Sequence, residues 1–205
     1  MSTMPLLDEA IAAHGGLERW RAIAAIDVAL RCGGLAFPLK GQPHALRSFR
    51  ATADPRRPHV ELHGIGIFDA ATPRPRGMAR RRWTRADLVH FAGYALWGYL
   101  ATPFVLADDD VVVRELPRRR LRVDFPARIP QHSTRQTFHF DAAARLTRLD
   151  YTAETVFGRL APAQHRCADH AWFDGLLVPT RRRVTPRGLP GPTLVSIAID
   201  ELRAR

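Results

Sequence analysis

The stretch DLVHFAGYALWGYLATPFVL, residues 87–106, is the longest apolar run in the chain, and the fold must accommodate it. At helical spacing its apolar residues fall on two faces. The first face holds Leu88, Phe91, Ala92, Ala95, Leu96 and Tyr99, and the second holds His90, Tyr94 and Trp97. A helix that is apolar on two faces must be covered on both sides. The stretch therefore predicts a buried helix that plugs the rest of the fold.

A membrane span is the alternative, since the stretch has nearly the roughly 20 residues that a bilayer crossing requires. Its composition argues against that interpretation. The stretch contains His90, two glycines and Pro103, and aspartates flank it at Asp87 and at 108–110. We therefore expect no integral membrane segment.

The overall composition is typical of a globular protein. The 205 residues are 46% hydrophobic and 25% charged, so we expect one well-filled core and a single domain spanning residues 1–205. A net charge of +11 raises the question of nucleic acid. However, nearly all basic residues are arginines, Lys40 being the single lysine, and no aromatic residues alternate with them to stack on bases. We expect no nucleic-acid partner.

The cysteines and the N-terminal residues indicate a reducing compartment. Cys32 and Cys167 are far apart and form no CxxC pair, which is typical of free thiols. Residues 1–16 lack the basic and long apolar regions of a signal peptide. The expected localisation is cytoplasmic, and the sequence leaves the oligomeric state open.

Most of the chain has the pattern of β-strands. Helical spacing from Pro5 to Ile23 is interrupted by His14-Gly15-Gly16, which predicts a helix, a turn and a short second helix. From Ile26 the pattern changes to period two. Strands are expected at 26–32, 44–52, 58–67, 111–116, 119–125, 133–141, 146–156, 164–174, 177–185 and 193–202. Short connections favour antiparallel hairpins, so the expected class is mainly β, within α+β.

Several segments resemble the lipoprotein-carrier-like (LolA-like) superfamily. An HGGLxxW motif at 14–20 follows a short helix, and similar bacterial proteins carry variants of AHGGLERWRAI, DFP, HSTRQTFHFD, RLDYTAE and FDGLLVPTRRRV. The resemblance covers nearly the whole chain. It implies a strongly curved antiparallel sheet forming an open half-barrel, with an N-terminal helix and an inserted apolar helix that plugs the concave face. It also implies a lipid or another apolar ligand on that face.

Tight turns at 141–144, near 158–162 and at 174–176 would place the C-terminal strands in register. One face would then be a wet ladder of charges, formed by Arg135, His139, Arg148, Asp150, Glu154, His165, Asp169, Arg181 and Arg183. The concave face would carry Phe138, Phe140, Leu149, Tyr151, Ala153, Ala168, Trp172 and Val184, with Thr134, Gln136, His170 and Arg182 as polar exceptions. A register slip of one residue would exchange the two faces.

Motifs for nucleotide binding and for catalysis are absent from the sequence. His165, Cys167 and Asp169 have a spacing that could bind a metal, but a solvated strand face is the commoner use of such a pattern. We expect no metal and no cofactor.

The favoured function is binding of a hydrophobic or amphipathic small molecule, or a lipid, in the concave cavity. Its ligand-binding residues would be His90, Tyr94, Trp97, Gln136 and Arg182. Arg182 has an alternative role, as a brace that pairs with a carboxylate or a backbone carbonyl beneath the plug helix.

An alternative function is a cofactor-independent enzyme, such as an acid–base cyclase or isomerase acting on a bulky apolar metabolite in the same cavity. His170 would then be the catalytic acid or base and Tyr151 a proton donor. A third hypothesis is a module that binds a partner through its basic face.

Overall fold

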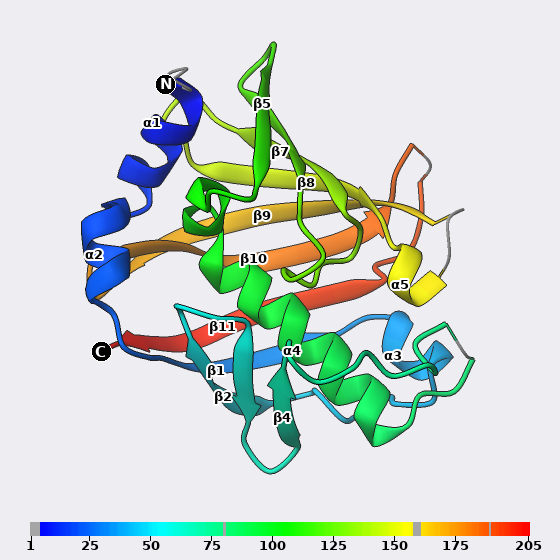
Figure 1. Cartoon of the computed structure of the whole chain (residues 1–205). Coiled ribbons are helices and arrows are strands. Elements are labelled where there is room, and N and C mark those ends of the chain that lie inside the picture. The colour runs from blue at the N-terminus through cyan, green and yellow to red at the C-terminus, as the bar shows by residue number, and fades with distance from the viewer. Residues whose placement is uncertain (1–4, 80, 158–160, 189) are drawn as a thin grey trace.

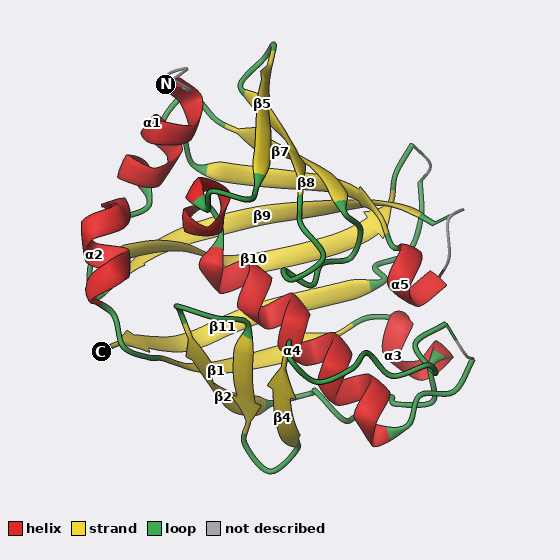
Figure 2. Ribbon diagram, viewed as in Figure 1, coloured by secondary structure: helices red, strands yellow, loops and turns green. Residues whose placement is uncertain are grey.

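The computed structural model describes residues 5–79, 81–157, 161–188 and 190–205. Its helices are α1 (Pro5–Ala13), α2 (Gly16–Ala22), α3 (Ala36–Leu39), α4 (Arg85–Ala101), α5 (Glu154–Phe157) and the 3-10 helix η1 (Phe104–Ala107). Its strands are β1 (Ile26–Gly33), β2 (Phe49–Asp54), β3 (His59–Leu62), β4 (Gly66–Asp69), β5 (Val112–Leu116), β6 (Arg120–Asp124), β7 (Arg135–Phe140), β8 (Leu146–Thr152), β9 (Pro162–Phe173), β10 (Leu176–Pro186) and β11 (Val195–Ala204). Figure 2 distinguishes the two kinds of element.

All strands belong to one sheet, in the order β4-β3-β2-β1-β11-β10-β9-β8-β7-β6-β5. Every pair of neighbouring strands is antiparallel. The sheet is strongly curved and wraps around α4, while β4 and β5 remain as its two free edges (Figure 1). The predicted mainly β class and the open half-barrel are confirmed.

The apolar stretch forms α4 and η1 on the concave face of the sheet. Thr84 and Asp87 form a capping box that begins the helix, since each side chain bonds the other's backbone N–H. From Leu88 to Ala101 every residue of α4 except Val89 is buried. The predicted plug helix is therefore confirmed. Among the described residues, no helix is long and apolar enough to cross a membrane.

The predicted bounds of two strands in the N-terminal half of the chain were wrong. The predicted strand at 58–67 is the hairpin of β3 and β4, because Gly64 takes a φ of 72° and turns the chain. This region is rich in small and β-branched residues, so period two alone did not reveal the turn. The predicted strand at 44–52 begins only at Phe49, and α3 was not predicted.

The HGG motif fits the turn between α1 and α2 against the hairpin of β9 and β10. Gly15 has a φ of 120°, and a Cβ there would lie 2.2 Å from the carbonyl oxygen of Gly175. The His14 carbonyl accepts from the Leu177 N–H at 3.1 Å, and Arg19 Nε donates to the Asp174 carbonyl at 2.7 Å. Glycine is therefore required at position 15 by both conformation and space.

The register of β9 differs from the prediction, and the difference exchanges its faces. The connection from β8 contains α5 instead of a tight turn, and Asp174-Gly175 makes a two-residue turn in which both residues have positive φ. His165 and Cys167 therefore point into the core, whereas Ala168 and Trp172 are exposed. The sequence predicted His165 and Cys167 on the solvated face and Ala168 and Trp172 on the concave face. All four predictions were wrong. The β8–β9 connection and the β9–β10 turn each move the register by an odd number of residues, so their effects on side-chain direction cancel at β10. Arg182 is therefore on the concave side, as predicted.

Candidate ligand cavity

An apolar cavity of about 430 Å³ lies between α4 and the sheet, beside the connection from β8 to β9 and the connection from β10 to β11. Helices α3 and α5 border it near the edge of the molecule (Figure 1). Its apolar lining consists of Ala36, Leu39, Phe91, Ala153, Val156, Ala161, Pro162, Ala163, Val184, Pro186, Leu194 and Val195. The polar residues that line it are Tyr99, His132, Tyr151 and Arg187. Such a space, mostly apolar with a few convergent polar groups, is typical of a small-molecule site.

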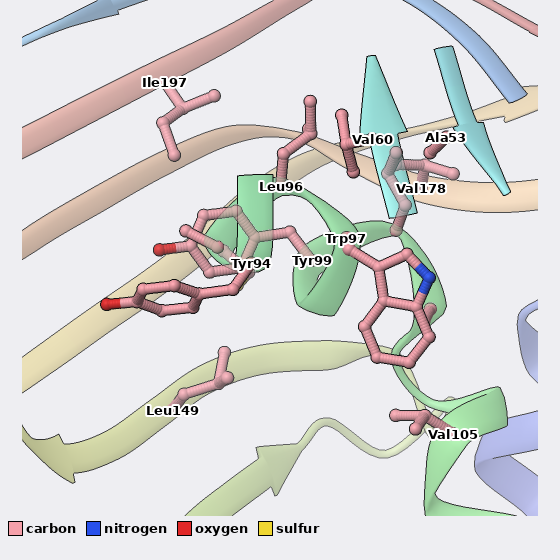
Figure 3. Packing of buried hydrophobic residues seen from close by; sticks show 14 of the residues in the cluster. Ala53, Val60, Tyr94, Leu96, Trp97, Tyr99, Val105, Leu149, Val178 and Ile197 are labelled. Carbon is pink, nitrogen blue, oxygen red and sulfur yellow. The ribbon is translucent and has the colours of Figure 1, made fainter. Parts of the chain in front are cut away.

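The polar groups form a network centred on His132. The Tyr94 hydroxyl lies 3.0 Å from His132 Nδ1, and the Tyr99 hydroxyl lies 2.9 Å from its Nε2. The Tyr151 ring stacks on the imidazole, with centroids 4.7 Å apart and planes 12° from parallel. Tyr151 and Tyr99 also share a hydrogen bond. In Figure 3 the hydroxyls of Tyr94 and Tyr99 point the same way, while Trp97 lies on the other side of the helix near Val105.

Burial keeps this network neutral at pH 7. Desolvation lowers the pKa of His132 to about 4, because the charged imidazolium would lose its water. For the same reason burial raises the pKa of Tyr99 and of Tyr151 well above the usual range of a phenol. A neutral imidazole has one donor and one acceptor nitrogen, so one tyrosine donates to His132 and the other accepts from it.

Arg182 braces the C-terminal end of α4. Its side chain is buried, and its Nη2 donates to the Tyr99 carbonyl at 3.0 Å. This carbonyl is in the last turn of α4, where carbonyls have no partner within the helix. The guanidinium also lies over the Tyr99 ring, 4.8 Å from its centroid, and its Nη1 lies 3.2 Å from Cys167 Sγ. These contacts match the predicted brace to a backbone carbonyl.

His165 is a buried polar residue directly behind the cavity wall. Its ring meets Tyr99 edge to face, with centroids 4.8 Å apart, and both ring nitrogens lack a hydrogen-bond partner among the described residues. Burial lowers its pKa well below the usual value. Asp169, its predicted neighbour on a metal-binding face, is exposed. Among the described residues, no three His, Cys, Asp or Glu side chains are grouped to hold a metal ion.

The other predicted ligand-binding residues are buried but spread over several places. His90 and Tyr94 line a separate hollow of about 350 Å³, and Trp97 lines another of about 380 Å³. Trp97 Nε1 donates to the Asp54 carbonyl at 2.8 Å, and Gln136 Nε2 donates to Gln131 Oε1 at 3.2 Å. The cavity wall comes from Phe91 and Tyr99, on the other predicted face of the helix.

The predicted catalytic pair is not brought together. Tyr151 lines the cavity, but His170 is not among the described residues that do so. His170 lies against His14, with ring centroids 6.3 Å apart, and its Nε2 bonds the Leu146 carbonyl at 3.0 Å. His170 therefore has its partners outside the cavity. His132 was missed, although it opens the segment HSTRQTFHFD, because it precedes β7 and has no strand periodicity.

Comparisons with known proteins identify the fold. No protein-family model and no curated protein matches the chain. A crystal structure of a LolA superfamily protein from Nitrosomonas europaea is similar, with a TM-score of 0.51 at 13% identity over 100% of this chain and 94% of that one. A DUF1329 family protein from Desulfovibrio piger has a TM-score of 0.41 at 12% identity, over 97% of this chain and 91% of that one. The similarity to the Nitrosomonas europaea structure shows that the chain has a LolA-like fold, which confirms the predicted resemblance at the level of fold.

Proposed function

We propose that the chain binds a hydrophobic or amphipathic small molecule, such as a lipid, in the cavity beside α4. The observation that supports this most strongly is the cavity itself, about 430 Å³ with a predominantly apolar lining. A volume in this range suits a ligand of metabolite size. The predicted cytoplasmic localisation stays a prediction.

The polar network favours a ligand whose polar group is uncharged. Tyr99, His132 and Tyr151 are all neutral at pH 7. Arg182, the nearby cation, already bonds the Tyr99 carbonyl. Arg187, which also lines the cavity, is exposed. A carboxylate held among the buried tyrosines would therefore lose its hydration without a buried cation to pair with. A hydroxyl or carbonyl group, in contrast, could exchange hydrogen bonds with the tyrosines.

The enzyme alternative has weaker support. General acid–base catalysis near neutrality needs a group whose pKa is close to 7. Burial moves the pKa of His132 down and that of Tyr151 up, away from that value, and His170 is not part of the cavity lining among the described residues. We therefore favour ligand binding over catalysis as the function of the cavity.

A cavity-filling variant tests the proposal. Ala163 is buried in the cavity wall on β9, and Ala168 is exposed on the outer face of the same strand. We expect Ala163→Leu to weaken binding of a neutral fluorescent probe, N-phenyl-1-naphthylamine, by at least about tenfold, since the added carbons occupy the ligand's space. Ala168→Leu, the matched control, should bind as the unmodified chain does.

Thermal melting of both variants checks that they remain folded. Equal probe binding by Ala163→Leu and Ala168→Leu would show that the probe is held elsewhere, and the proposal would then fail. A long-chain alcohol should displace the probe better than the fatty acid of the same length, because the buried polar groups of the lining are neutral and its cation, Arg187, is exposed.

A further inference from the structure

A second hollow, on the outer face of the sheet, is lined by arginines. It has a volume of about 780 Å³ and lies over β1, β11, β10 and β9. Small residues form its floor, namely Gly33, Ala168, Ser196 and Ala198. The arginines that line it are Arg31, Arg47, Arg166, Arg181, Arg182 and Arg183, and no carboxylate is among the described lining residues. Arg182 is buried on the other face, so five exposed arginines surround the floor. We call this hollow the arginine trough.

Strand register brings like charges face to face in the trough. Arg166 is directly opposite Arg183, and on its other side it is opposite Arg148. Directly opposed side chains of antiparallel strands have Cβ atoms about 5 Å apart, and like charges in such pairs repel. Arg181 lies on the same face as Arg183, two residues earlier on β10. Arg166, Arg181 and Arg183 therefore leave the sheet on one face, beside the small residues of the floor.

The nearby carboxylates neutralise the edges of the trough and leave its centre positive. Asp150 bonds Arg148 at 2.6 and 2.7 Å, and Asp200 bonds Arg31 at 2.8 and 2.7 Å. Asp169 lies 3.8 Å from Arg181. In the described part of the chain, Arg166 and Arg183 have no carboxylate within ion-pair distance. Arg183 donates to the neutral Thr193 hydroxyl at 2.7 Å.

We propose that the arginine trough is a binding site for a phosphate-bearing ligand. A guanidinium group presents a planar fork of donors that matches phosphate oxygens, and one phosphate has enough oxygens for several forks. An anion over Ala168 would convert the repulsion between Arg166 and Arg183 into two attractions. Aromatic side chains are absent from the described lining, so the bases of a nucleic acid have no platform on which to stack.

This site is separate from the apolar cavity, because the two hollows are on opposite faces of the sheet and their lining residues do not overlap. Its test is therefore independent of the proposed function. The probe is inorganic pyrophosphate, titrated calorimetrically at 0.15 M salt, where screening over about 8 Å removes most long-range attraction. We expect saturable binding of one pyrophosphate per chain.

The decisive variant is Arg166→Gln/Arg183→Gln. We expect it to bind pyrophosphate at least about tenfold more weakly, since each charge-assisted hydrogen bond accounts for roughly a tenfold change in affinity or more. Its melting temperature should be equal to or above that of the unmodified chain, because the cross-strand repulsion is gone. The matched control, Arg114→Gln/Arg203→Gln, removes two exposed arginines outside the trough. Its affinity for pyrophosphate should fall by less than about threefold.

A vesicle experiment distinguishes the source of the phosphate. If vesicles of phosphatidylcholine with phosphatidic acid displace pyrophosphate, and pure phosphatidylcholine vesicles do not, the ligand is a lipid headgroup. If neither displaces it, the ligand is a free phosphate compound. The proposal is overturned if pyrophosphate shows no saturable binding, or if both double variants lose the same affinity, since the attraction would then come from net charge alone.

Discussion

Replacing Gly93 by alanine tests how closely α4 packs on the sheet. A Cβ at position 93 would lie 2.1 Å from Cβ and 2.3 Å from Cγ of Phe68. Phe68 is on β4 and only 2% exposed, so its ring is enclosed and its Cβ is fixed to the strand backbone. The helix or the strand would have to move to admit one methyl group.

Two opposing effects set the magnitude. In an exposed helix interior, glycine to alanine stabilises by about 1 kcal/mol, because glycine has the larger conformational entropy to lose. Overpacking of a filled core costs about 1–3 kcal/mol and occasionally more. A contact of 2.1 Å with an atom next to the backbone belongs at the upper end of that range. We therefore expect Gly93→Ala to lower the free energy of unfolding by about 1–3 kcal/mol.

Gly98, in the same helix, provides the control. A Cβ there would meet the Gln131 side-chain amide at 3.1 and 3.3 Å, and the end of a flexible side chain can move. Gly98→Ala should be neutral or stabilising by up to about 1 kcal/mol. Urea unfolding followed by tryptophan fluorescence should separate the two variants by about 1–4 kcal/mol, with unchanged slopes. Equal stabilities would refute the close packing of α4 on β4.

Two further predictions concern buried polar groups. Arg182→Met should lower the free energy of unfolding by about 1–3 kcal/mol, because the Tyr99 carbonyl loses its partner at the end of α4; a more stable variant in urea would show that the buried cation costs more than the brace contributes. The folded-state pKa of His132, about 4, is below its usual value of 6.5, so protonation favours the unfolded chain and stability falls as the pH drops from 6.5 to 4. Between pH 6.5 and pH 4, the free energy of unfolding of His132→Gln should fall by about 3 kcal/mol less than that of the unmodified chain. Parallel curves of stability against pH would contradict the lowered pKa of His132.

The architecture was accessible from the sequence because it depends on patterns that are local. Helical spacing in residues 87–106 indicated the plug helix, and alternation such as Leu121, Val123 and Phe125 indicated strands. Asp174-Gly175 indicated a tight hairpin. The hairpin of β3 and β4 was missed because the positive φ of Gly64 divides an otherwise continuous strand pattern.

The site was less accessible because it depends on register and on distant segments. A connection that contains α5, instead of a tight turn, moved His165 from the outer face to the core. His132 reaches Tyr94 and Tyr99 across more than thirty positions of sequence, and no spacing rule relates such residues. The choice between the two faces of α4 likewise required knowledge of which strands lie beside each face.

Native mass spectrometry of the purified chain tests the central claim, that the cavity beside α4 holds a hydrophobic or amphipathic ligand. We predict an added mass that denaturation releases as a lipid or an apolar metabolite, and that is absent from Ala163→Leu but present in Ala168→Leu. The bare mass of the chain, both as purified and after incubation with a lipid extract, would contradict the account.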